Sequence, residues 1–141
     1  MTLPRVTDPD GGVAEYDRSA TALAYSTFDG NSCSCLGCKN FRSAFDPKWM
    51  DAALRDTCAT IGIDPFKAVE TTYYDIDPKT GLAIYSGECP FVGRLIDEIT
   101  VSKSYWSFSR GLVAQDEFGD TQAAVHFSVL LPWILSEPPP K

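Results

Sequence analysis

Three cysteines lie close together in the first third of the chain, in the pattern Cys33-x-Cys35-x-x-Cys38. In structural sites zinc takes four tetrahedral ligands, usually thiolates or imidazoles. Tight turns bring thiolates at this spacing to one metal ion. Lys39 and Arg42 follow closely, and positive charge beside a thiol lowers its pKa. The pattern therefore predicts a structural zinc site with these three cysteines as ligands.

The fourth ligand is missing from this motif and must come from another element. Cys89 is the first candidate, because it stands before Pro90 at the start of a predicted strand. His126, the one histidine in the sequence, is the second candidate. Cys58 falls on the apolar face of a predicted helix, so we expect it to be a core residue.

Two other interpretations of the cluster stay open. It can be a redox site that uses Cys35 or Cys38, or a turn with no special role. A thioredoxin-like protein needs a βαβ unit, which the hairpin pattern of this chain does not supply. The sequence also shows no Gly-rich phosphate loop, no serine nucleophile elbow and no second histidine for a catalytic pair. We therefore expect a protein that is not an enzyme.

The composition limits the class of partner. A chain of 141 residues fits one domain, and its 44% hydrophobic and 22% charged residues are ordinary for a soluble globular protein. With 12 Lys and Arg against 19 Asp and Glu, the formal charge is −7. This balance argues against nucleic acid or an anionic membrane as partner, because phosphate binding depends on Lys and Arg. It favours solubility and a protein partner, in particular a basic one.

The sequence also bears on the compartment. The N-terminal residues lack the apolar stretch of a signal peptide, and the longest apolar run, residues 129–135, is far too short to cross a bilayer. We therefore expect a cytoplasmic protein. In that reducing compartment closely spaced cysteines indicate metal or redox chemistry rather than structural disulfides.

One helix is predicted clearly, over residues 46–61. Asp46 can cap its start, Pro47 suits its first position, and Gly62 is a natural stop. Apolar residues recur at spacings of three and four between these limits, which gives one apolar face. Shorter helical turns are predicted at 39–45 and 66–70.

The rest of the chain favours β structure. Strands are predicted at 20–28, 71–76, 82–85, 91–96, 102–109 and 123–131. Residues 77–81 form the turn of a hairpin. Residues 1–18, broken by Pro and Gly, are predicted to be a flexible arm, and the Pro-rich residues 136–141 an exposed tail. Together these elements predict a single α+β domain over residues 1–141, with an N-terminal helical layer packed on an antiparallel β-sheet.

Four short segments resemble a group of small bacterial proteins that have no established enzyme activity. The segments are CSCLGCKNF at 33–41, GIDP at 62–65, YSGECPFVG at 85–93 and PWIL at 132–135. The resemblance implies an accessory or immunity-type protein. It departs at Cys89-Pro90, where members of the group carry aromatic residues or a histidine, and this departure weakens Cys89 as a zinc ligand.

Three functional hypotheses follow. The first is a non-enzymatic acidic binding protein, such as an immunity protein that neutralises a basic toxin, because acidic complementarity speeds the capture of a basic partner. Adjacent aromatic pairs such as Tyr105-Trp106 support recognition, since neighbouring side chains in a strand point to opposite faces and one of them lies outside the core. The second is a small structural-zinc module with an unidentified partner. The third is a cysteine-based redox protein.

Overall fold

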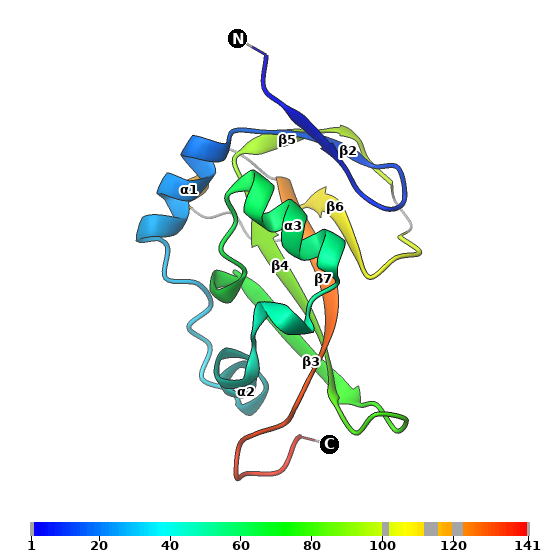
Figure 1. The fold of residues 1–141 in the computed structure, drawn as a ribbon. Helices are drawn as coiled ribbons and strands as arrows, with labels where there is room; N and C mark the ends of the chain where they lie inside the picture. Colours follow the sequence, from blue (N-terminus) through cyan, green and yellow to red (C-terminus); the bar gives the residue numbers. More distant parts are fainter. Residues whose placement is uncertain (1, 100–101, 112–115, 120–122, 141) are drawn as a thin grey trace.

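The computed structural model describes residues 2–99, 102–111, 116–119 and 123–140. These residues form a mixed α+β domain with three α-helices and two antiparallel sheets, of three and four strands. In Figure 1, α3 lies in front of the larger sheet, and α1 and α2 lie to its left. The predicted fold class is therefore confirmed. None of the described helices combines the length and the apolar character that a bilayer crossing requires.

The larger sheet has the strand order β3-β4-β7-β6. Its strands are β3 (Glu70–Ile76), β4 (Ala83–Pro90), β6 (Trp106–Arg110) and β7 (Ala123–Leu131). The predicted hairpin is confirmed: β3 and β4 pair in antiparallel fashion around a turn in which Gly81 has a φ of 73°, a conformation that favours glycine. β7 occupies the predicted range, whereas β4 extends further than expected.

Alternation along β7 shows where the core lies. Val125, Phe127, Val129 and Leu131 are buried, whereas His126 and Leu130 are only partly buried and Ser128 is exposed. The buried set faces the helices, and burial of each such side chain contributes on the order of 1.5–3 kcal/mol. The core therefore lies between the helices and one face of this sheet.

The N-terminal residues are not the irregular arm that the sequence predicts. β1 (Arg5–Thr7) and β2 (Val13–Tyr16) pair with each other, and β2 also pairs with β5 (Gly93–Asp97), giving the smaller sheet. Asp8 is 4% exposed, and its carboxylate accepts hydrogen bonds from the N–H groups of Gly12 and Phe108. The segment is thus tied to β6, a long-range contact that no local pattern reveals.

The strand predicted at 20–28 is wrong, because α1 (Arg18–Thr27) occupies this segment. The side chain of Asp17 accepts a hydrogen bond from the N–H of Ala20 and caps the helix. Thr21, Ala24 and Tyr25 form its buried face, at the spacing of three and four that is typical of a helix. The alanines of this segment also favour a helix.

The single helix predicted at 46–61 is interrupted. Asp46 caps only the short 3-10 helix η1 (Pro47–Trp49), Met50 is extended, and the side chain of Asp51 caps α3 (Ala52–Ile61) at the N–H groups of Ala53 and Leu54. Gly62 ends α3 in the left-handed conformation, as predicted.

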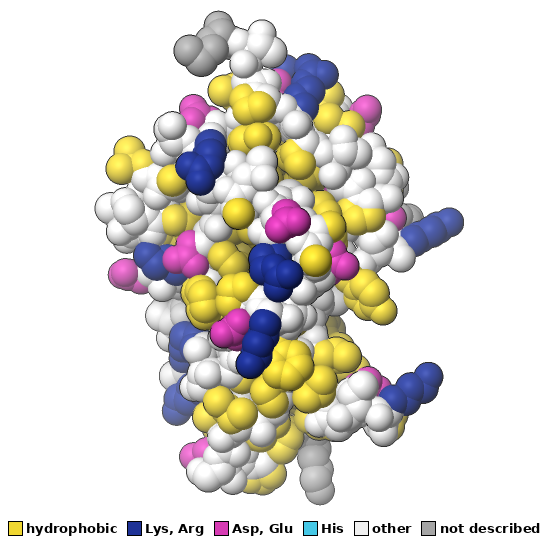
Figure 2. Space-filling model, viewed as in Figure 1, with side chains coloured by type: hydrophobic (Ala, Val, Ile, Leu, Met, Phe, Trp, Pro, Cys, Tyr) yellow, Lys and Arg dark blue, Asp and Glu magenta, His cyan; other side chains and the backbone are white. Residues whose placement is uncertain are grey.

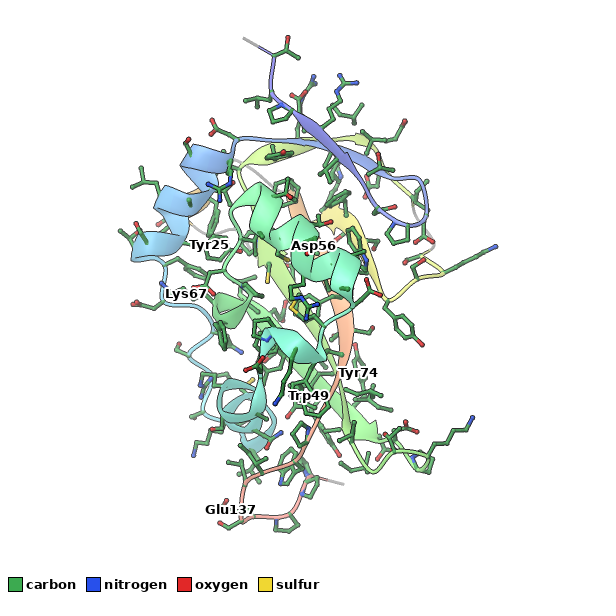
Figure 3. All side chains as sticks on the ribbon, in the orientation of Figure 1. Tyr25, Trp49, Asp56, Lys67, Tyr74 and Glu137 are labelled. Atoms are coloured by element: carbon green, nitrogen blue, oxygen red, sulfur yellow. The ribbon has the colours of Figure 1, made fainter. Side chains whose placement is uncertain are left out.

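The remaining elements are short. The helical turns predicted at 39–45 and 66–70 correspond to α2 (Leu36–Ala44) and to η2 (Pro65–Lys67), and η3 (Asp116–Phe118) packs against α1. Lys67 joins η2 to α1, because its Nζ donates a hydrogen bond to the carbonyl of Tyr25 over 2.6 Å (Figure 3). β5 and β6 both begin later than the strands predicted at 91–96 and 102–109.

Candidate metal centre

The three cysteines of the motif meet at the N-terminal end of α2. Their sulfur atoms all lie within 4.8 Å of one another. Cys33 and Cys35 are exposed, whereas Cys38, inside the first turn of the helix, is 6% exposed. A tetrahedral zinc with Zn–S bonds of about 2.3 Å needs sulfurs about 3.8 Å apart, so only a small contraction would bring these three thiols to one ion.

Cys35 is the N-cap residue of α2. Its sulfur accepts a hydrogen bond from the N–H of Cys38 at 3.4 Å. The pKa of Cys35 is lowered below its usual value of 9.0, first by this hydrogen bond, because it favours the charged thiolate. The pKa of Cys38 is raised, first by its burial. The helix start thus combines an exposed thiol with a lowered pKa and a buried thiol with a raised pKa.

Asn31 supports Cys38 from the preceding loop. Its Oδ1 accepts the N–H of Cys33 at 2.9 Å, which fixes the amide orientation and leaves Nδ2 as the donor. Nδ2 donates to the sulfur of Cys38 at 3.2 Å and to the hydroxyl of Thr71 at 3.1 Å. The Thr71 hydroxyl also lies 3.4 Å from the same sulfur. Cys38 therefore has polar partners suited to a thiolate, although it is buried.

Arg42 fixes the loop that carries Cys33. Its guanidinium donates to the carbonyl oxygens of Asn31 at 3.2 Å and of Cys33 at 2.7 Å. The sequence suggested that Arg42 acts on the thiols by charge, but its hydrogen bonds go to the backbone. Its structural effect is to hold residues 31–33 against α2, so that Cys33 stays beside the other two cysteines.

Buried polar contacts join α2 to the sheet and to the C-terminal segment. Tyr85 donates its hydroxyl proton to the carbonyl of Gly37 at 2.7 Å. Asn40, fully buried, donates to the carbonyl of Pro132 at 3.1 Å and accepts the N–H of Ile134 at 2.8 Å. Residues from α2, β4 and the segment after β7 therefore meet here and hold α2 against the sheet.

Cys89 is not brought to the cluster, contrary to the prediction. It lies on β4, opposite Val125 in β7, with 0% exposure. Its neighbours include Cys58 and Tyr25, and burial raises its pKa well above 9.0. Such a thiol stays protonated and does not serve as a ligand in this arrangement. Cys58, also buried, is the core residue that the sequence predicts, with a pKa raised by burial to about 12.

His126, the second candidate for the fourth ligand, also lies elsewhere. It points from β7 to the sheet face opposite Val125 and Phe127, and its register neighbours are Glu88 and Ser107. Its pKa is lowered, first by desolvation. Within the described ranges, no fourth cysteine, histidine or carboxylate joins the three thiols.

The donor set is soft and nearly complete. Three thiols, an amide N–H directed at one of them and the start of a helix form a site that can hold a thiophilic metal ion. Sequence reasoning found the three ligands but missed Asn31 and Thr71. Asn31 stands two residues before Cys33, so its nearness in the sequence was the available signal, whereas Thr71 is brought near Cys38 by β3.

The chain was compared with protein families, curated proteins and solved structures. No protein-family model, no curated protein and no solved structure matches this chain.

Proposed function

We propose that the protein is a non-enzymatic binding protein in which Cys33, Cys35 and Cys38 hold a structural zinc ion. The observation that carries this proposal is the approach of the three sulfurs to within 4.8 Å of one another. Zinc would join the loop before α2 to the first turn of the helix, where Asn31 and Arg42 already hold the same segment. Metal-bound thiolates need such donors to orient them.

The fourth coordination position in this proposal belongs to water or to a ligand from outside the chain. Two of the three thiols are exposed, so the ion would be accessible from solvent. A zinc ion with three protein ligands and an open position resembles catalytic sites in its coordination. Here, however, no described acid or base joins the cluster, so the structural role is favoured.

Metal analysis of freshly purified protein tests the zinc proposal. Under reducing conditions at neutral pH we expect about one equivalent of zinc per chain. Cys35→Ser should lose it, and Cys58→Ala, which changes a thiol outside the cluster, should retain it. Zinc well below half an equivalent in the unmodified protein would contradict the proposal, as would equal retention by both variants.

The partner in this proposal is a basic protein, and an immunity protein that neutralises a basic toxin fits it best. The formal charge of −7 supports a basic partner, because complementary charge steers association and makes it sensitive to salt. Co-purification from the native host at low and high salt tests the partner. Recovery of a basic protein that high salt releases is expected, together with protection against a toxin encoded nearby. The proposal would be contradicted if no basic partner is recovered and no protection is found.

A cysteine redox function is the second candidate, and the position of Cys35 at the start of α2 favours it. In such a protein an exposed thiolate attacks a disulfide, and the cysteine three residues later resolves the mixed disulfide. Metal-free protein that readily forms a Cys35–Cys38 disulfide in a glutathione buffer would favour this function. Thiols that zinc protects from the same buffer would favour the metal site.

A further inference from the structure

On its β6 side, β7 extends beyond the end of β6. β6 pairs with residues 123–127 of β7, and the last ladder contact beyond β6 is the N–H of Ser128, which donates to the carbonyl of Tyr105 at 2.7 Å. The chain before Tyr105 turns away, because Asp10 accepts hydrogen bonds from the hydroxyls of Ser102 and Ser104. Among the described residues, no strand pairs with the last residues of β7 on the β6 side.

The backbone of Leu130 points to this open edge. In a strand the N–H and C=O groups of successive residues alternate between the two neighbouring strands. Since the N–H of Ser128 points toward β6, the N–H of Val129 points toward β4, and that of Leu130 points toward the β6 side again. Beyond Tyr105 that side holds no described strand. No described strand occupies this side of Leu130, so its N–H and C=O groups point to where a further strand can pair.

A groove of about 650 Å³ runs along the same edge. It is lined by Trp49 of η1, by Met50, which follows η1, by Ile84 and Leu130 of the sheet, and by Tyr105. Tyr105 is 74% exposed and Trp49 36%. In Figure 2 the outline of the molecule is indented on the right, between the β3–β4 hairpin and the chain before β6, and Figure 3 shows Trp49 in front of the strands.

The charged residues described at the groove have one sign. Asp51 and Asp77 line it, and none of its described lining residues is a lysine or arginine. Lys48 lies close, with its Nζ 5.6 Å from the centre of the Trp49 ring, but it is not part of the lining. A guest with apolar side chains and a cationic one is therefore complementary to this groove, whereas an acidic guest would be repelled.

We propose that an extended, lysine- or arginine-containing segment of the partner protein adds to the open edge of β7 as a further strand. Its backbone pairs with Leu130, alternate apolar side chains contact Trp49, Met50 and Ile84, and a cationic side chain faces Asp51 and Asp77. This is the β-augmentation mode of peptide recognition, in which backbone hydrogen bonds give affinity and the alternate side chains give specificity. The inference rests on the proposed binding function and assigns it to a surface.

Leu130→Pro tests the backbone contact at the open edge separately from the rest of the groove. Proline removes the N–H that faces the groove, and no hydrogen bond to β4 is lost, because that N–H does not belong to the β4–β7 ladder. Leu130→Val keeps the N–H and serves as the matched control. Trp49→Ala is a second test, which removes one wall of the groove and leaves the strand unchanged.

The probe is a phage-displayed library of random heptapeptides selected on the zinc-loaded protein. Enriched peptides should contain lysine or arginine within an apolar, β-forming sequence. Leu130→Pro should weaken their binding at least about tenfold, which corresponds to about 1.4 kcal/mol. Leu130→Val should change it little, and Trp49→Ala should weaken it. Circular dichroism and thermal unfolding verify that each variant folds; if Leu130→Pro does not, Trp49→Ala decides.

Several outcomes would overturn the proposal. Failure to enrich any peptide, enrichment of acidic peptides, or equal binding by all variants would each do so. A dimer seen by light scattering that Leu130→Pro converts to monomer would show that a second copy occupies the edge. These peptide-binding tests can fail while the protein still binds zinc and captures a basic partner. In that case the proposed function stands, and only the placement of the binding surface on β7 is wrong.

Discussion

Two groups of cysteines lie in opposite surroundings in this protein. Cys33, Cys35 and Cys38 meet at the start of α2, with hydrogen-bond donors around them and two of the three thiols exposed. Cys58 and Cys89 lie in the core, at 2% and 0% exposure, where burial raises the pKa of each. The side chains are the same, so the difference in chemistry comes from the elements that hold them.

The two groups differ in the backbone and amide donors that reach their sulfur atoms. The N–H of Cys38 lowers the pKa of Cys35, and Asn31 donates to the sulfur of the buried Cys38. No such donor outweighs desolvation at Cys89, whose pKa is raised first by burial. A cysteine in the core is therefore a small apolar residue here, and a cysteine at the helix start is a potential ligand.

The largest expected contrast is in thiol reactivity. In metal-free native protein, iodoacetamide should modify Cys35 readily, whereas Cys58 should react at least about a thousandfold more slowly, because its exposure requires unfolding, which costs about 5–15 kcal/mol. The Cys35 rate should rise with pH and reach half its maximum below pH 9.0, since its pKa is lowered. Mass spectrometry of digested protein measures both rates. Equal labelling of Cys35 and Cys58 would contradict the difference in accessibility between the two groups of cysteines.

The next contrast concerns the donor to Cys38. Asn31→Ala should lower zinc affinity about 10- to 100-fold, the usual effect of removing a group that orients a metal ligand. Asn31→Asp keeps the acceptor for the N–H of Cys33 but loses the donor to sulfur, so it should weaken zinc as well. Competition with a chelating dye gives both affinities. Unchanged zinc affinity in Asn31→Asp would mean that the N–H···S contact has no role.

A smaller effect is expected on folding. Cys89→Ser places a hydroxyl in a fully buried position and should lower the free energy of unfolding by about 1–3 kcal/mol, with zinc content unchanged. Cys33→Ser, at an exposed position, should change the stability of the metal-free protein by less than about 0.5 kcal/mol. Urea unfolding of the two variants measures this. The reverse order of effects would contradict the burial of Cys89 and the exposure of Cys33.

The smallest effect is local. Removal of zinc by a chelator should speed amide hydrogen exchange in the first turn of α2, at Cys38 and Lys39, because the loop before it loses an anchor. Exchange in β7 should not change, since the contacts of that strand with β4 do not involve the cluster. Faster exchange throughout β7 would mean that the metal stabilises the whole domain.

Local patterns predicted part of the fold. The β3–β4 hairpin and β7 follow from turn residues and from alternation, which are local signals. The segment predicted as a strand at 20–28 is α1, which the cap at Asp17 and the buried face of Thr21, Ala24 and Tyr25 explain. The predicted helix at 46–61 is divided because Asp51 offers a second cap. The smaller sheet depends on Asp8 and β5, which lie far apart in the sequence.

The candidate site was predicted in the same uneven way. The three ligands of the motif follow from spacing alone, because a tight turn and one helical turn bring them together. The choice of Cys89 assumed that it stands just before a strand that begins at residue 91. β4 instead continues to Pro90, so Cys89 lies near its end and inside the core. The roles of Thr71 and Tyr85 depend on strands that pack beneath α2, and nothing in the motif indicates them.

X-ray absorption at the zinc edge of the purified protein tests the central claim most directly, because it counts the sulfur ligands of the bound metal. The account predicts three sulfurs at about 2.3 Å and one oxygen or nitrogen at about 2.0–2.1 Å. The Cys58→Ala variant should give the same spectrum, and Cys38→Ser should lose the metal. Four sulfur ligands, or a shell of oxygen and nitrogen alone, would contradict the proposed site.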